Sequence, residues 1–167
     1  MSSKSSKKPA AQDFDRTVRA NMAQMSGGLA MSSFSAAWLD WLTHLAQSPA
    51  RQLELQQEAL GRAADNGSFA LRALAGEALS PAEGFDGAAE KRYADPAWSQ
   101  FPFNVLARAH QNTQALLKDS VRDVAGLDHY HAQLLDFAVR MMGDASSPAN
   151  TLATNPELLA LTKAEQG

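Results

Sequence analysis

A chain of 167 residues is long enough for one domain with a sizeable core. Its net charge of −3 argues against nucleic-acid binding by bulk electrostatics. The absence of cysteine excludes disulfides, a thiolate nucleophile and cysteine-ligated metals. Alanine is abundant and isoleucine is missing, which favours helix over sheet because β-branched residues are the preferred strand formers. We therefore predict an all-α fold of five to seven helices in one domain.

Residues 1–12 consist mainly of Ser, Lys and Ala, and we expect them to form a disordered basic tail. Lys4, Lys7 and Lys8 could contact an anionic surface, although a solvated tail is the preferred interpretation. The tail lacks the apolar segment of a secretory signal, and no apolar run approaches transmembrane length. We expect a cytoplasmic protein without a transmembrane segment.

An amphipathic helix is predicted for residues 13–28. Phe14, Val18, Met22 and Met25 recur at spacings of four, four and three, which places them in one apolar stripe. Gly27-Gly28 ends the helix. The stripe could dock on its own domain, on a partner or on an apolar surface.

The next predicted helix runs from about residue 34 to 47, with Ser33 as its cap. Its apolar face consists of Phe34, Trp38, Trp41, Leu42 and Leu45, widened by Ala37 and Leu39. Such a face belongs to the core more often than to an interface, but it would be a strong interface if it were exposed. His44 has no second ligand at a suitable spacing, so we expect a surface or partly buried imidazole.

Ser48-Pro49 predicts a further helix start. We expect that helix to end near residue 64, because Asp65-Asn66-Gly67 is typical of a break. A short helix over 69–79 then follows, with Leu71 and Leu74 inward. Residues from about 80 to 94 lack periodicity and are predicted to be a linker.

Four aromatic rings crowd the segment 91–103, where we predict a packed corner between helices: Tyr93, Trp98, Phe101 and Phe103. Asp95 precedes Pro96, so Pro96 can open a helical turn.

The longest helix is predicted over 104–124, with Gly126 as its stop and Asp128 as the cap of the next helix, about 129–142. The expected inward face of this helix comprises Leu134, Leu135, Phe137, Ala138, Met141 and Met142. His129 and His131 diverge on a helix, so they form a poor metal pair.

A last helix opens at Asn155-Pro156-Glu157, with Asn as cap and Pro in the first position. Its shortness suggests a chain cut from something longer.

No sequence motif for catalysis is present. The chain lacks the G-x-S-x-G elbow, the P-loop, the dinucleotide-binding glycines and the H-E-x-x-H metal motif. We expect no catalytic residues, no cofactor and no metal in this segment.

Two blocks resemble the polyhydroxyalkanoate (poly-3-hydroxybutyrate) synthases of the class I type. They are KRYADPAWSQFPFN at 91–104 and SSPANTLATNPELL at 146–159; a weaker likeness covers WLDWLTHLAQSPARQLELQQEAL at 38–60. The resemblance spans residues from about 35 to 165. It identifies 29–167 as the helical domain that precedes the catalytic domain in these acyltransferases.

The resemblance implies a parent enzyme that polymerises (R)-3-hydroxyacyl-CoA into polyester granules and releases CoA. The parent's Cys nucleophile, with Asp and His partners, belongs to a C-terminal domain that is absent here. By the same resemblance the N-terminal domain supports activity, dimerisation and granule attachment. Its implied partners are the catalytic domain of the same synthase, the granule surface or a granule-associated protein, and a second copy.

Both apolar stripes are therefore candidates for docking on the polyester phase: Phe14, Val18, Met22 and Met25, and Trp38, Trp41, Leu42 and Leu45. A structural role is expected for Tyr93, Asp95, Trp98, Asn155 and Pro156. Two alternatives remain open: a free-standing, phasin-like granule adaptor, and a lid or substrate-channel wall for the catalytic domain.

Overall fold

The computed structural model describes residues 13–14, 16–18, 31–85 and 91–165. Five long α-helices and three short 3-10 turns fall in these ranges: α2 (Met31–Ala46), α3 (Pro49–Leu74), η1 (Pro96–Ser99), α5 (Phe103–Ser120), α6 (His129–Ala145), η2 (Pro148–Asn150), η3 (Leu152–Thr154) and α7 (Pro156–Glu165). No strand occurs among the described residues. The predicted all-α fold is confirmed. The expected tail, residues 1–12, lies outside the described part.

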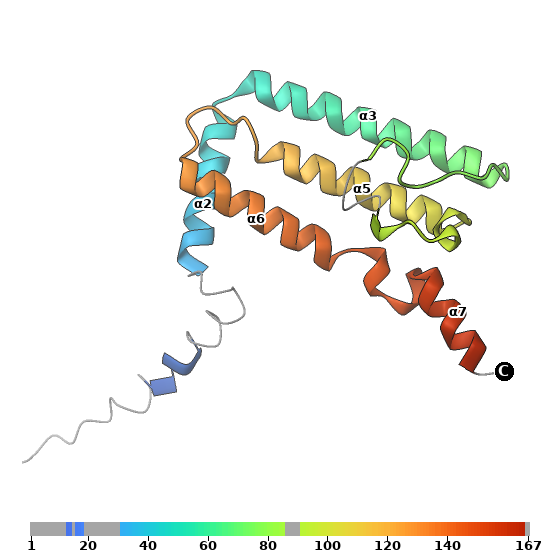
Figure 1. Ribbon diagram of the computed structural model, residues 1–167. Helices are drawn as coiled ribbons and strands as arrows, with labels where there is room; N and C mark the ends of the chain where they lie inside the picture. Colours follow the sequence, from blue (N-terminus) through green and yellow to red (C-terminus); the bar gives the residue numbers. More distant parts are fainter. Residues whose placement is uncertain (1–12, 15, 19–30, 86–90, 166–167) are drawn as a thin grey trace, which may run out of the picture.

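Three long helices lie side by side in the order α3, α5, α6, with α5 antiparallel to both neighbours (Figure 1). Helix α2 crosses one end of this row and packs mainly on α6, while α7 lies beyond the other end and contacts η1 and η3. Helix α3 therefore lies at the edge of the row. It packs mainly on α5 and makes a smaller contact with α2.

Local sequence signals set most helix starts. Pro49 opens α3 as predicted, although the Ser48 hydroxyl donates to the His44 carbonyl and does not cap α3. The Asp128 carboxylate accepts the N–H groups of Tyr130 and His131 at the start of α6, which confirms the predicted cap. Helix α2 begins earlier than expected, so Ser33 lies inside it.

The predicted break at Asp65-Asn66-Gly67 is wrong, since α3 continues through it to Leu74. Tertiary contacts offset the poor local propensity. The Asp65 carboxylate binds Arg108 of α5, and the Asn66 side-chain oxygen accepts from Asn112 of α5 at 2.7 Å. Gly67 faces open space.

The main core cluster joins α2, α5 and α6. Ala37, Val121, Leu134, Leu135 and Val139 are buried in it. A smaller cluster joins the end of α3 to the following loop through Phe69, Ala73 and Leu79. These two clusters, with the aromatic corner, hold the row of helices together.

Five assignments to the core are wrong. Phe137, Met141 and Met142 of α6 are exposed, and so are Leu71 and Leu74 of α3. Helix α3 packs mainly on α5, and α6 packs on α2 and α5, so the remaining sides of α3 and α6 are exposed. Helix α5 also ends at Ser120, earlier than predicted, and the turn after it buries Val121 and Val124.

Two glycine substitutions should act in opposite directions. Gly67→Ala should raise the free energy of unfolding by about 0.5–1 kcal/mol, because Gly67 lies inside a helix and an added Cβ meets nothing within 4 Å. Gly126→Ala should lower it by about 1–2 kcal/mol, since Gly126 has φ of 85° and the new Cβ would lie 2.6 Å from His44 Cδ2. Urea unfolding at low protein concentration measures both. A destabilising Gly67→Ala would contradict an uninterrupted α3.

Candidate interaction surfaces

The apolar face of α2 divides between core and surface. The Trp38 and Trp41 rings meet edge to face at 5.3 Å and pack, half-buried, on the main core cluster. The Trp41 indole N–H donates to the Ser120 carbonyl at 2.8 Å. Leu45 is half-buried, whereas Leu42 is 56% exposed. Of the four candidates on this helix, Leu42 is therefore the one that is open to a partner.

Leu39 extends the exposed side of α2. It is 66% exposed, more than Leu42, and neither side chain belongs to the main core cluster. In the N-terminal stripe, Phe14 is 69% exposed and Val18 is half-buried, while Met22 and Met25 lie outside the described residues. We refer to three exposed residues, Phe14, Leu39 and Leu42, as the N-terminal apolar surface; Leu39 and Leu42 lie on α2, and Phe14 lies in a separate segment.

The aromatic corner buries two of its four rings fully; Phe103 is half-buried, and Phe101, which was predicted to pack there, is 53% exposed. Tyr93 and Trp98 are buried and their rings meet at 4.7 Å. The Asp95 carboxylate accepts the Ala97 N–H at 2.8 Å and so caps η1, with Pro96 in its first position. The Trp98 indole N–H donates to Glu157 Oε1 at 2.8 Å, which ties the corner to α7.

Asn155 fixes the start of α7. Its side-chain oxygen accepts the N–H groups of Glu157 and Leu158, and its amide donates to the Ala149 carbonyl at 2.8 Å. Pro156 is buried at the first helical position. The sequence blocks 91–104 and 146–159 are thus in contact, since the Trp98 indole N–H donates to the Glu157 carboxylate.

A hydrogen-bonded chain of side chains, which the sequence did not predict, lies behind this corner. The Tyr93 hydroxyl bonds His110 Nδ1 at 2.9 Å and Ser147 Oγ at 3.1 Å, and His110 Nε2 bonds the Gly143 carbonyl at 2.8 Å. Burial lowers the pKa of His110 and raises the pKa of Tyr93. The neutral imidazole therefore donates to Gly143 and accepts from Tyr93.

This chain borders a shallow cleft of roughly 430 Å³ lined by His110, Thr113, Ser147 and Thr151 among others. The arrangement is unsuited to nucleophilic catalysis, because Ser147 does not contact the imidazole directly and both ring nitrogens are already engaged. It joins segments 93, 110 and 143–147 as a structural lock.

Acid should weaken this lock. The lowered pKa of His110 means that the folded chain binds fewer protons than the unfolded chain just below about pH 6.5. The free energy of unfolding should therefore fall as the pH drops from 7 towards 5.5. His110→Gln should be less stable at pH 7 and should show a flatter pH dependence, measured by urea unfolding at each pH. The exposed His129→Gln is the matched control, and an unchanged slope in His110→Gln would contradict the assignment.

The interface between α3 and α5 is a polar seam. Arg108 binds both oxygens of Asp65, at 2.7 and 2.9 Å, and Asn112 donates to the same carboxylate. Hydrogen bonding from Arg108 is the main reason that the pKa of Asp65 is lowered. At the other end, Arg62 pairs with the Asp119 carboxylate at 2.6 Å and Arg51 donates to the Asp119 carbonyl. Arg51, Arg62 and Asp65 of α3 thus face α5, whereas Glu54 and Arg72 are exposed.

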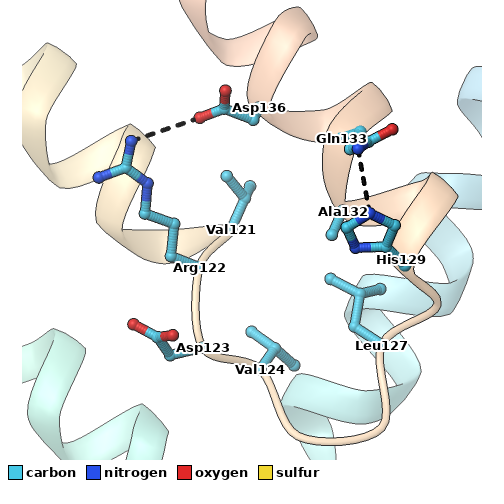
Figure 2. Close-up of a pocket in the computed structure, with 9 residues that line it drawn as sticks. All are labelled: Val121, Arg122, Asp123, Val124, Leu127, His129, Ala132, Gln133 and Asp136. Carbon is cyan, nitrogen blue, oxygen red and sulfur yellow. Dashed lines mark hydrogen bonds and ion pairs between the residues drawn. The ribbon is translucent and has the colours of Figure 1, made fainter.

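A second cleft of roughly 450 Å³ lies where the turn after α5 meets α6 (Figure 2). Arg122 and Asp136 face each other across it at 3.6 Å, and Gln133 contacts the His129 ring at 3.1 Å. His131 points elsewhere and binds Asp40 of α2 at 2.6 Å, so the two histidines diverge as predicted. Among the described residues no cluster of His, Asp or Glu is arranged to hold a metal ion.

None of the helices in the described part of the chain is both long and apolar enough to cross a membrane.

Two protein families match the chain. The family "Poly-beta-hydroxybutyrate polymerase N terminal" matches residues 9–51, and "Poly-beta-hydroxybutyrate polymerase (PhaC) N-terminus" matches residues 89–167. The second match contains the aromatic corner, the His110 lock and α7. No solved structure matches the chain.

Curated relatives carry the same description. The chain is 31% identical over 166 residues to the poly(3-hydroxyalkanoate) polymerase subunit PhaC of Rhizobium meliloti, with 95% of the chain and 27% of that protein covered. It is 32% identical over 149 residues to the corresponding subunit of Cupriavidus necator, with 73% of the chain and 23% of that protein covered. The chain thus spans about a quarter of the length of these relatives.

Proposed function

The chain belongs to the N-terminal region of the poly(3-hydroxyalkanoate) polymerases, and we propose that it serves there as a non-catalytic domain that attaches the enzyme to its polyester product. The acyl-transfer chemistry, which links hydroxyacyl groups from CoA thioesters, would belong to the remainder of the polymerase. Granule attachment, dimerisation and support of the catalytic domain are the three roles that we assign to this domain. Its place would be the surface of cytoplasmic polyester granules.

The exposure of the N-terminal apolar surface is the main support for attachment to the polyester. Phe14, Leu39 and Leu42 are each more than half exposed, and the polar seam and main core cluster do not involve them. A growing polyester is an apolar phase, and burial of a Leu or Phe side chain contributes up to about 1.5–3 kcal/mol. Three such side chains suffice for reversible attachment.

The Trp38 and Trp41 side chains are better suited to supporting this surface than to forming it. Both contact the main core cluster, and their removal would disturb the packing of α2 on α6. Granule attachment is therefore assigned to Leu39 and Leu42, the exposed leucines beside the tryptophans on α2, together with Phe14. Trp variants cannot separate attachment from folding, whereas variants of exposed leucines can.

Sedimentation with protein-free particles of amorphous poly(3-hydroxybutyrate) tests the proposal. The intact chain should sediment with the particles, and a Leu39→Ser/Leu42→Ser variant should bind about 30-fold more weakly, since two partly buried leucines each lose about 1 kcal/mol. Leu161→Ser, which changes a 61% exposed leucine on α7, is the matched control. Circular dichroism checks that all variants remain folded.

Two outcomes would overturn granule attachment: an intact chain that stays in the supernatant, or equal binding of the double variant and the control. The domain's role would then lie in support of the catalytic domain, as in the alternative of a lid or channel wall. The exposed Leu158 and Leu161 of α7 suit such a contact. Activity of the full polymerase with and without residues 1–167 would measure that support. The family matches favour this polymerase domain over a free-standing phasin-like adaptor.

A further inference from the structure

The two halves of α3 are fastened to α5 by different contacts. Near the start of α3, Arg51 donates to the Asp119 carbonyl and Arg62 pairs with the Asp119 carboxylate. Further along, Arg108 of α5 binds both oxygens of Asp65, at 2.7 and 2.9 Å. The second half of α3 can therefore lose its polar contacts with α5 while the first half keeps its own.

A weak point lies between the two halves. The segment Asp65-Asn66-Gly67 is typical of a break, and glycine inside a helix weakens it. A Cβ added at Gly67 would meet nothing within 4 Å, so the packing of the closed structure does not require glycine there. Helix α3 is therefore easiest to break at this segment.

The chain after α3 folds back against the end of the helix. We call residues 75–85 the strap, and they return alongside α3 (Figure 1). Leu79 and Pro81 of the strap are buried, and Leu79 packs with Phe69 and Ala73 of α3 in the smaller cluster. This cluster shares no residue with the main core cluster, so the strap and the end of α3 are packed mainly on each other.

One side chain of α5 holds both of these parts. Besides binding Asp65 of α3, the Arg108 guanidinium donates to the Glu83 carbonyl of the strap. It also lies 5.4 Å from the Phe69 ring centre and 4.8 Å from that of Phe85. A single guanidinium thus contacts the weak point, the end of α3 and the strap, and the loss of one contact weakens the others.

We propose that residues 67–85 form a latch that opens as one unit about a hinge at Asn66-Gly67, with Arg108 as its catch, while the rest of the domain stays folded. Opening breaks the contacts of Arg108 and the smaller cluster. The contacts of Asp119 with the first half of α3 and the main core cluster remain. Opening below the level of global unfolding is expected of a segment whose buried contacts are few and largely its own.

Opening changes the chemistry of this side of the domain. The closed latch covers the smaller cluster and leaves only 14% of the Arg108 side chain exposed. The open latch would present a guanidinium beside four apolar side chains: Phe69, Ala73, Leu79 and Val105. The closed form therefore keeps a combined apolar and cationic surface away from solvent, and opening makes it available.

The absence of cysteine allows thiol labelling to measure the opening. Ala73 is buried in the latch and Ala37 in the main core cluster, so a thiol at either place reacts only after its surroundings open. Where the labelling rate is proportional to reagent concentration, the Ala73→Cys chain should react at least about 10-fold faster than the Ala37→Cys chain. Equal rates would show that the latch opens only by global unfolding, and would overturn the proposal.

Two matched glycines locate the hinge. Gly61 and Gly67 are both exposed inside α3, and an added Cβ would meet nothing within 4 Å at either. Gly67→Ala should slow the labelling of Ala73→Cys about 2- to 5-fold, because alanine favours the unbroken helix. Gly61→Ala should leave that rate unchanged, since its surroundings stay helical in both states. Equal slowing by both variants, or by neither, would overturn the hinge.

Removal of the catch should have the opposite effect. Arg108→Met should speed the labelling of Ala73→Cys about 30-fold, because the contacts of the guanidinium with Asp65 and the strap are lost. An unchanged rate would show that Arg108 does not hold the latch. Circular dichroism checks that each variant remains folded.

A change in the strap tests whether the strap and the end of α3 move together. Leu79→Ala should accelerate amide hydrogen exchange over residues 71–74 of α3 more than over residues 52–58. A strap that opens by itself would leave both stretches of α3 unchanged, and global unfolding would accelerate both equally. Either result would overturn the single unit, and the measurement needs no introduced thiol.

The latch goes beyond the attachment role proposed above, and the two fail separately. Leu39 and Leu42 lie on α2, outside the latch, so Gly67→Ala should leave sedimentation with polyester particles unchanged. An intact chain that stays in the supernatant overturns attachment and leaves the latch. Equal labelling rates of Ala37→Cys and Ala73→Cys overturn the latch and leave attachment.

Discussion

Trp98→Ala should lower the free energy of unfolding by about 3–5 kcal/mol, the largest loss expected from a single truncation in this chain. The Trp98 ring has no exposed surface, and it meets the rings of Tyr93 at 4.7 Å and Phe103 at 6.4 Å. The truncation opens a cavity beneath Tyr93 and also leaves Glu157 without its indole partner. Since Trp98 joins η1, α5 and α7, its loss should loosen α7 before the other helices.

Urea unfolding followed by circular dichroism measures this loss. Trp98→Phe separates the two contributions, because it keeps most of the packing and removes the N–H bond to Glu157; we expect it to cost about 1–2 kcal/mol. Trp38→Ala, which truncates a half-buried ring, should cost less than Trp98→Ala. A loss below about 1 kcal/mol for Trp98→Ala would show that the corner does not hold the domain together.

Features set by neighbouring residues could be predicted from the sequence. The Pro49 start, the Asp128 cap, the Asp95-Pro96 turn and the Asn155-Pro156 start each depend on a few adjacent residues, and all four are present. These signals can be recognised locally because a capping side chain binds N–H groups only two or three positions further along the chain.

The continuation of α3 could not be predicted, because its cause is distant in sequence. Asp65-Asn66-Gly67 favours a break by propensity, and the contacts that overcome this preference come from Arg108 and Asn112 of α5. Nothing in the local pattern shows that such partners are available. The same limit applies to His110, whose role depends on Tyr93, Gly143 and Ser147.

The direction of an apolar face also depends on distant residues. Periodicity identified apolar faces on α2 and α6, and predicted Leu71 and Leu74 to be inward, but it could not show which neighbour would cover these residues. In α2 the tryptophans contact the main core cluster and Leu39 is exposed; in α3 both Leu71 and Leu74 are exposed. The sequence therefore identifies which apolar residues share a helix face, but only the packing of the helices shows which of these residues are exposed.

Arg108→Met should lower the free energy of unfolding by about 2–3 kcal/mol. The Arg108 guanidinium binds both oxygens of Asp65 and donates to the Glu83 carbonyl, and it lies 5.4 Å from the Phe69 ring centre and 4.8 Å from that of Phe85. Methionine keeps much of the side-chain length and removes these polar and cation–π contacts. Asp65 is partly exposed, and solvent screening holds the loss below that of a fully buried pair.

Arg108→Lys is the matched control for charge. Lysine keeps the positive charge but cannot bind both carboxylate oxygens through a planar fork, so we expect it to recover less than half of the loss. A double-mutant cycle with Asp65→Asn isolates the pair. Full recovery by lysine would show that charge, not geometry, stabilises the seam.

The effect of Arg108→Met should be local as well as global. Without Arg108, the Asp65-Asn66-Gly67 segment regains its preference for a break, and the exchange of backbone amide hydrogens should accelerate over residues 65–74 before it does over 49–64. Gly67→Ala should partly restore protection in the same variant, because it raises helix propensity at the weak point. Uniform acceleration along α3 would contradict this account. Since Leu71 and Leu74 belong to this segment, the polar contacts of Asp65 and Asn66 with α5 also keep the exposed C-terminal end of α3 helical.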